Sequence, residues 1–166
     1  MMRLQPLVAT VLFMSFPAVA GAADTLSNFK EPAVTAHFAT GPFDVKMAPQ
    51  ALSPVAEHSG LGRMSIDKQF HGALEAGSTG EMLGFRDMAL GSGGYVAMET
   101  VRGTLDGRAG SFVLQHSSTM TRGEPAQSIT VVPDSGTGAL VGLTGRMVVD
   151  IAPGGAHSYR FDYTLP

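Results

Sequence analysis

The sequence predicts an all-β protein, a closed eight-stranded antiparallel barrel, and three observations lead to this fold class. Eight runs alternate apolar and polar residues, the period-two pattern of half-buried strands. Glycine is abundant, at 21 of 166 residues, and only 15% of the residues are charged. This composition is typical of short strands joined by tight turns. Closing such a sheet into a barrel removes its exposed edges, and a two-sheet sandwich is the alternative.

The predicted strands follow one another with turn residues between them. The first strand bends at Gly41-Pro42, since these residues interrupt a regular ladder. Asp106-Gly107 predicts a tight hairpin because both residues tolerate positive φ. The strands cover roughly 34–48, 62–74, 79–88, 94–105, 110–120, 127–134, 145–152 and 156–165. Other turns and connections are expected at 49–61, 91–94, 135–144 and 153–155. The apolar residues of 135–144 are expected to fold onto the core or cap one end of the barrel.

The N-terminal segment 1–22 is typical of a signal peptide. Arg3 supplies a positive start, and the apolar stretch from Leu7 to Phe16 is too short to anchor the chain across a bilayer. Small residues at 18, 20 and 22 provide the pattern that signal peptidase cleaves. We therefore expect an exported protein, periplasmic or extracellular, whose mature part 23–166 forms one barrel domain. The chain has no cysteine, which excludes both a lipid anchor and disulfide bonds.

The charge of the mature domain argues against nucleic-acid binding. Removing residues 1–22 takes away Arg3 and no acidic residue, so the formal charge moves from −3 to −4. A mildly acidic domain lacks the basic face that phosphate backbones require. The five histidines show no paired spacing, and the glycine-rich 136–138 is not followed by a helix pattern. The sequence therefore predicts no metal and no cofactor.

Strand alternation also predicts which residues face the barrel interior. The inward set contains aromatic residues and four polar ones; the polar ones are Lys68, Glu81, Glu99 and His116. Charges in a dry interior are unfavourable unless they are paired, but they are expected around a wet cavity or a ligand. A structural ion pair between Lys68 and a glutamate is the simpler interpretation. The methionines of the mature chain are expected to fill the core, with an adaptable ligand-contacting lining as the second interpretation.

Three functions remain open on these observations. The favoured one is binding of a small apolar or amphipathic molecule inside the barrel, with candidate contacts at Lys68, Tyr95, Phe112 and Tyr159. The second is a proton-transfer isomerase or cyclase with candidate catalytic residues Glu99, His116 and Glu81. The third is a structural protein that forms a homo-oligomer through outward apolar residues, namely Val96, Met98 and Val113.

Several ordered motifs resemble a known family. They are Gly62-Arg63-Met64-Ser65-Ile66-Asp67-Lys68, Gly80-Glu81-Met82-Leu83, Gly94-Tyr95-Val96-Ala97-Met98-Glu99, Gly103-Thr104-Leu105-Asp106-Gly107-Arg108, Gly110-Ser111-Phe112-Val113-Leu114-Gln115-His116, Val131-Val132-Pro133-Asp134-Ser135-Gly136-Thr137-Gly138 and His157-Ser158-Tyr159-Arg160-Phe161-Asp162-Tyr163. Over roughly 40–166 the chain resembles the DUF3224 family. The resemblance implies a closed eight-stranded barrel similar to that of allene oxide cyclase, and it implies no assigned function.

Overall fold

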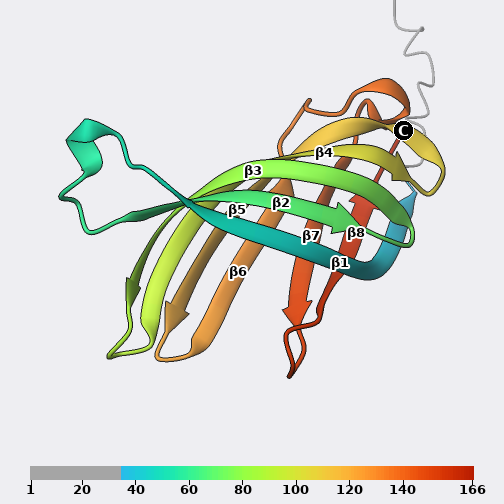
Figure 1. Ribbon diagram of the computed structural model, residues 1–166. Coiled ribbons are helices and arrows are strands. Elements are labelled where there is room, and N and C mark those ends of the chain that lie inside the picture. Colours follow the sequence, from blue (N-terminus) through green and yellow to red (C-terminus); the bar gives the residue numbers. More distant parts are fainter. Residues whose placement is uncertain (1–34) are drawn as a thin grey trace, which may run out of the picture. The chain divides into compact units, whose positions relative to one another are not determined.

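A computed structural model describes residues 35–166, and the predicted signal segment 1–22 lies outside the described residues. The described residues form a closed barrel of eight antiparallel strands, each paired with the next one along the chain, as Figure 1 shows. The predicted fold class is therefore confirmed. The strands are β1 (Ala36–Gln50), β2 (Gly62–Phe70), β3 (Leu74–Asp87), β4 (Ser92–Leu105), β5 (Arg108–Thr121), β6 (Glu124–Val131), β7 (Thr144–Ile151) and β8 (His157–Thr164).

The helical content of residues 35–166 is two single 3-10 turns. They are η1 (Pro54–Ala56) in the β1–β2 connection and η2 (Gly138–Leu140) between β6 and β7. Within residues 35–166, no helix has the length and apolarity needed to cross a bilayer. The η2 segment lies against β5, where the backbone N–H of Thr137 donates to the carbonyl of Ser111 at 2.8 Å. Leu140 and Leu143 are buried there, so this connection caps one end of the barrel as expected, while Val141 is exposed.

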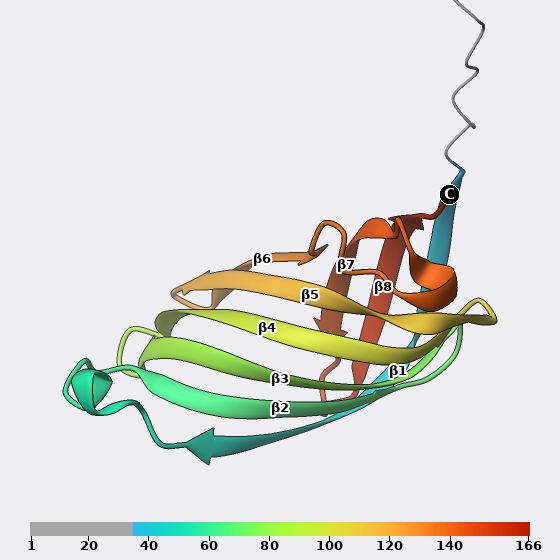
Figure 2. The same cartoon turned by 90° about the horizontal axis from the view of Figure 1, so that it is seen from above.

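Strand β1 closes the barrel by pairing with two neighbours in succession. Its first half, up to Phe43, pairs with β8, and its second half, from Phe43, pairs with β2. The change of partner falls next to Gly41-Pro42, where the sequence predicts a bend. Figure 2 shows β7 and β8 running across the direction of β2–β5, and β1 joining the two groups. The seam between β6 and β7 has only two paired positions, Ile129 with Met147 and Thr130 with Arg146.

Two turns lie at other positions than the sequence pattern indicated. The second run was expected to continue to 74 and the third to begin at 79, but the turn lies at 71–73, where Gly72 has a φ of 97°. Strand β3 therefore begins at Leu74, five residues before the predicted start, and it includes Gly77 as well as Gly80. The β5–β6 hairpin turns at Arg122-Gly123, so β6 begins at Glu124 rather than near 127. By contrast, the hairpin predicted at Asp106-Gly107 is confirmed, with φ values of 47° and 78°.

The hydrophobic core fills the end of the barrel that η2 caps. Its members come from all eight strands, and Leu140, Leu143 and Leu165 join them from outside the strands. Phe112 stacks on Phe161 with ring centroids 5.8 Å apart, and Phe161 stacks on Tyr163 at 5.3 Å. Phe70 meets Tyr159 edge-on at 5.5 Å. Offset and edge-to-face aromatic contacts of this kind add to the stabilisation that burial alone provides.

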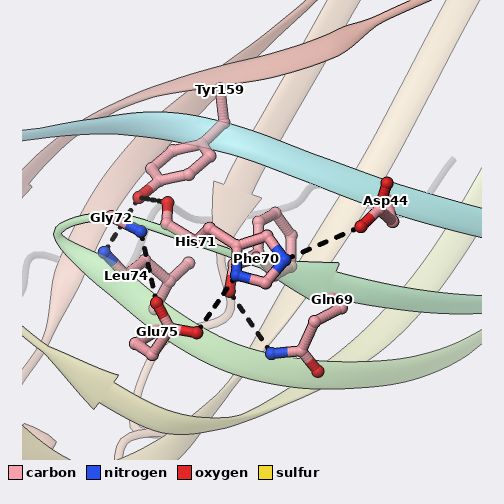
Figure 3. A network of polar contacts seen from close by, with 8 residues as sticks. All are labelled: Asp44, Gln69, Phe70, His71, Gly72, Leu74, Glu75 and Tyr159. Atoms are coloured by element: carbon pink, nitrogen blue, oxygen red, sulfur yellow. Dashed lines mark hydrogen bonds and ion pairs between the residues drawn. The ribbon is translucent and has the colours of Figure 1, made fainter.

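The turn between β2 and β3 is attached to β8 through Tyr159 (Figure 3). The Tyr159 hydroxyl donates to the carbonyl of His71 at 3.1 Å and accepts from the N–H of Leu74 at 2.8 Å. The His71 ring lies between two carboxylates, with Nδ1 3.2 Å from Glu75 Oε1 and Nε2 3.6 Å from Asp44 Oδ2. Burial raises the pKa of Tyr159, so its hydroxyl stays protonated near neutral pH. The hydroxyl can therefore donate to His71 and accept from Leu74 at the same time, and both hydrogen bonds attach the turn to β8.

Tyr159→Phe is expected to lower the free energy of unfolding by about 1–3 kcal/mol, because the buried Leu74 N–H loses its acceptor. Urea unfolding followed by circular dichroism measures the change. Tyr95→Phe is the matched control, since the Tyr95 hydroxyl bonds to no residue in 35–166. Equal unfolding midpoints for the two variants would contradict the assigned role of Tyr159.

Candidate functional site

A polar cluster lies in the middle of the barrel interior, around the carboxylate of Glu99 on β4. Lys68 Nζ of β2 donates to Glu99 Oε2 at 2.7 Å, and Ser78 Oγ of β3 donates to Oε1. His116 Nε2 of β5 lies 2.9 Å from Oε2. All four residues are buried, and Glu99 is only 1% exposed. Strand alternation therefore placed Lys68, Glu99 and His116 correctly in the interior, and the structure brings them into contact.

The cluster forms because small residues separate its members. Glu99 pairs with Gly80 on β3, and Gly80 in turn pairs with Ile66 on β2. A Cβ atom at Gly80 would lie 2.9 Å from Glu99 Cα and 3.1 Å from Glu99 Cβ. The missing side chain lets Glu99 reach across β3 to Lys68, two strands away. On the other side, the small residue Ala97 pairs with His116 and leaves room for the ring to approach Glu99.

The surroundings of Glu99 keep it ionised. Burial alone would raise the pKa of its carboxyl, because a charge is poorly solvated in the interior. The close contact with His116, the positive charge of Lys68, and the hydrogen bonds from Lys68 and Ser78 outweigh this effect and lower the pKa to about 2. The His116 Nε2 makes no well-directed hydrogen bond to the carboxylate, so its contribution is a close polar contact. Lys68 Nζ also lies 5.4 Å from the Phe43 ring centroid and 5.6 Å from that of Phe70.

A cavity of about 620 Å³ opens at the end of the barrel opposite the packed core. This end carries the β1–β2 connection and the β3–β4 hairpin, on the left of Figure 1. We call it the mouth. Most of the cavity wall is apolar, and four of the lining residues are methionines; the lining includes Met47, Met64, Met82, Met120, Tyr95, Ser118, Gly84, Gly93 and Arg86.

The register shows how the wall of the mouth is built. In one row, Met64 pairs with Met82, and Met82 pairs with Ala97. The next row outward contains, in pairing order from β2 to β5, Gly62, Gly84, Tyr95 and Ser118. The outermost row contains Arg86, Gly93 and Met120. In the two outer rows, the positions at 62, 84, 93 and 118 are glycines or a serine, and these small residues leave the space that forms the cavity.

The polar cluster separates the cavity from the core. Along β4, Tyr95 lines the cavity, Ala97 is one inward position deeper, and Glu99 is the next. Since inward residues alternate, each step moves about 6.6 Å along the strand. Beyond Glu99, Val101 and Leu105 belong to the packed core. Lys68, Glu99 and His116 therefore lie below the lining of the cavity rather than in its wall.

The inward assignment of Glu81 is wrong. Its side chain is 53% exposed and pairs on the outer face with Arg63, whose Nε lies 2.7 Å from Glu81 Oε2. The inward positions of β3 are the even-numbered residues from Ser78 to Gly84, most of them small. Leu83 and Phe85 share the outward face with Glu81 and are exposed. The apolar residues of this strand therefore indicated the wrong face.

The aromatic candidates are divided between the two halves of the barrel. Tyr95 lines the cavity, whereas Phe112 and Tyr159 are buried in the packed half. Met147 is buried in the core, so the expectation that methionines fill the core holds for that residue, but not for the four methionines at the mouth. Arg86 is not among the site residues that the sequence predicts. Its spacing of two from Gly84 is the alternation signal that could have placed it on the cavity wall.

On the outer face, two of the three residues expected at an oligomer interface are exposed. Val96 and Met98 border a shallow hollow of about 390 Å³. Val113 is half-buried, and the segment after β6 bonds to its backbone: its carbonyl accepts from the N–H of Val132, and its N–H donates to the Ser135 hydroxyl. For metals, residues 35–166 hold no group of three His, Cys, Asp or Glu side chains arranged to bind an ion.

Glu99→Gln is expected to lower the free energy of unfolding at neutral pH by about 3–5 kcal/mol, because Lys68 loses its buried counter-charge. The pH dependence has a definite sign. The folded-state pKa of about 2 lies below the ordinary value of 4.5, so the stabilisation is complete above about pH 5 and declines as the pH falls toward 2. The stability difference between wild type and the variant should shrink over that range in urea titrations.

Glu81→Gln is the matched control, because that glutamate has an exposed partner, and its loss should be much smaller. If Glu99→Gln fails to fold, the double variant Lys68→Met/Glu99→Gln removes the unpaired charge and should recover the fold. A stability difference that is constant between pH 5 and pH 2 would refute the assigned ionisation of Glu99.

The comparisons with known proteins agree with the motif resemblance. The DUF3224 family, described as a protein of unknown function, matches residues 39–163. No curated protein matches the chain. The chain is 47% identical to a DUF3224-family protein of unknown function from Shewanella oneidensis MR-1, whose crystal structure was determined at 1.84 Å. The alignment covers 80% of this chain and 98% of that one, with a TM-score of 0.71. The family match, the identity and the shared barrel together establish that the chain belongs to the DUF3224 family.

Proposed function

We propose that this barrel binds a small apolar or amphipathic molecule in the cavity at its mouth. The observation that carries the proposal is the cavity itself, about 620 Å³ in volume and mostly apolar in its wall. Binding sites for small molecules have volumes of a few hundred to about 1,000 Å³ and contain a few polar groups in an apolar lining. The mouth fits this description, with Tyr95, Ser118 and Arg86 as polar members of the lining.

The methionines suit a ligand of variable shape. Met64 and Met82 are direct cross-strand partners on the inward face, and Met120 lies on β5 across the glycine-rich part of the wall. Methionine side chains are unbranched and polarisable, so they adjust to different apolar surfaces. A lining of this kind favours recognition by apolar contact area over recognition by precise shape.

The polar cluster supports binding better than it supports proton transfer. A carboxyl with a pKa of about 2 is ionised at neutral pH and has little tendency to accept or release a proton there. Its partners Lys68 and Ser78 are both engaged with it. We therefore assign Glu99 and Lys68 to the floor beneath the cavity, where they fix the register of β2, β3 and β4.

The proposal includes export of the chain, with 1–22 as the cleaved segment. Expression of the full chain in a bacterial host, followed by fractionation, tests this part. We expect the periplasmic or secreted protein to have an intact mass that lacks residues 1–22. Full-length protein retained in the cytoplasm would contradict it, and a variant with leucine at Ala20 and Ala22 is the control that should block cleavage.

Ser118→Trp is expected to abolish binding by filling the cavity, because Ser118 lies in its wall beside Tyr95. The neutral fluorescent probe N-phenyl-1-naphthylamine measures binding by its emission, with saturation at one site in the wild type. The chain has no tryptophan, so the new indole also reports ligand contact by quenching or energy transfer.

Ser117→Trp is the matched control, since the neighbouring Ser117 faces outward on the same strand and should leave probe binding unchanged. Loss of binding in both variants would show that the effect is not due to filling of the cavity. Absence of saturable probe binding in the wild type would overturn the proposed function.

A further inference from the structure

We infer that the ligand of the mouth is a single-chain anionic amphiphile, whose acid group lies between Arg86 and Tyr95 and whose apolar chain follows the methionines inward. This inference rests on the proposed function and specifies the class of ligand for that cavity. It is carried by the register of β3 and β4, by two glycines in the wall, and by two polar side chains with unused hydrogen-bonding capacity.

The register places Arg86 and Tyr95 close together at the rim of the cavity, where Arg86 is exposed and Tyr95 is half-buried. Tyr95 pairs with Gly84, and Arg86 pairs with Gly93, so the two side chains occupy diagonal positions on adjacent strands. Diagonal neighbours lie about 7–8 Å apart, within reach of long side chains. The guanidinium and the phenol can therefore approach one group from two sides.

The two glycines keep the space between Arg86 and Tyr95 free of side chains. A Cβ atom at Gly84 would lie 3.2 Å from both the Gly94 carbonyl oxygen and Tyr95 Cβ. A Cβ atom at Gly93 would lie 3.3 Å from Arg86 Cα and closer still to the carbonyl oxygen of Phe85. Larger residues would crowd the backbone at both positions. We call the space between Arg86 and Tyr95 the notch. It exists because β3 and β4 approach too closely here for any side chain at 84 or 93.

Arg86 has no counter-charge within residues 35–166, where it forms neither an ion pair nor a hydrogen bond. It is also the one charged residue among those that line the cavity. The adjacent carboxylate of Asp87 points into the β3–β4 turn, where it accepts from the N–H groups of Ala89 and Leu90 at 2.9 and 3.0 Å. Glu99 is deeper and is paired with Lys68. The positive charge of Arg86 is thus available to an anion and repels a cationic ligand.

Tyr95 supplies the second donor. Its hydroxyl bonds to no residue of the described chain, although the side chain is half-buried. Burial, and to a smaller extent the negative charge of Glu99, raises the pKa of Tyr95, so the phenol keeps its proton and can donate. Hydrogen bonds to an ionised acceptor are stronger than those between neutral groups. An acid group in the notch would therefore accept from both Tyr95 and Arg86.

The orientation of the amphiphile follows from the order of the rows. Arg86 lies in the outermost row, near water, and the methionines at 64 and 82 lie deeper. Ala97 lies beside Met82 in the same row, and Ile66 and Gly80 continue the wall below as far as the buried ion pair. The acid group therefore remains at the rim, where its desolvation is small, and the chain is buried.

The test compares ligands that share a ten-carbon chain and differ in their head group. Decanoate, decyl phosphate, decanol and decyltrimethylammonium are titrated by displacement of N-phenyl-1-naphthylamine at pH 8 and low salt. We expect the tighter of the two anions to bind about tenfold better than decanol, and the cation to bind no better than decanol. The ranking of decanoate against decyl phosphate assigns the acid group.

Two variants and a control locate the effect. Arg86→Gln should reduce anion affinity to that of decanol and leave decanol unchanged, and Tyr95→Phe should reduce anion affinity severalfold. Arg160→Gln, on the outer face of β8, should change nothing. Equal binding of anions and decanol to the wild type, or an equal loss in Arg160→Gln, would overturn this inference while the proposed function stands. If neither the probe nor any of the chains binds, the proposed function fails as well.

Discussion

The ion pair between Lys68 and Glu99 divides the barrel interior into a packed half and an open half. Two charges in the interior are tolerated only when they are matched and hydrogen-bonded, and here Ser78 and His116 complete the surroundings of the carboxylate. The contact between Lys68 and Glu99 requires a fixed pairing register of β2, β3 and β4, because Glu99 reaches Lys68 across Gly80, which has no side chain. A slip of one residue would turn these charges outward and bring apolar residues of the core to the surface.

The two halves of the interior are filled to different extents because their inward residues differ in size. In the packed half, aromatic rings and leucines fill the interior and account for most of the stabilisation from apolar burial. In the mouth, glycine, serine and methionine take the same positions and leave space. The stability of one half allows the other to remain unfilled, since an open cavity forfeits the contacts that a filled core would make. The ion pair lies where this change occurs, and its contacts are all made within the barrel.

The sequence predicts the barrel and its buried charges, but not the division of its interior. Strand alternation assigns Lys68, Glu99 and His116 to the inside because their neighbours on the same face are apolar and those on the other are polar. This contrast disappears near the mouth, where Leu83 and Phe85 face water and Gly80 and Gly84 face the interior, so Glu81 was placed on the wrong side. Alternation also carries no information on depth along the barrel. Phe112 and Tyr95 are therefore equivalent in the sequence pattern, although one is packed in the core and the other lines a cavity.

The barrel itself does not identify a function, because one fold supports many unrelated activities. The structure shows which buried polar side chains already have hydrogen-bond or ion-pair partners within the barrel. Tyr159 is committed to the β2–β3 turn, and Lys68 and Ser78 are committed to Glu99. Each of these residues would have to break its contacts before it could bind a ligand, and a buried group left without a partner is unfavourable. Arg86 and Tyr95 require no such exchange. In the binding mode that we propose, recognition of a polar ligand group therefore falls to the rim of the mouth, whereas the interior below it contributes apolar contact and a fixed shape.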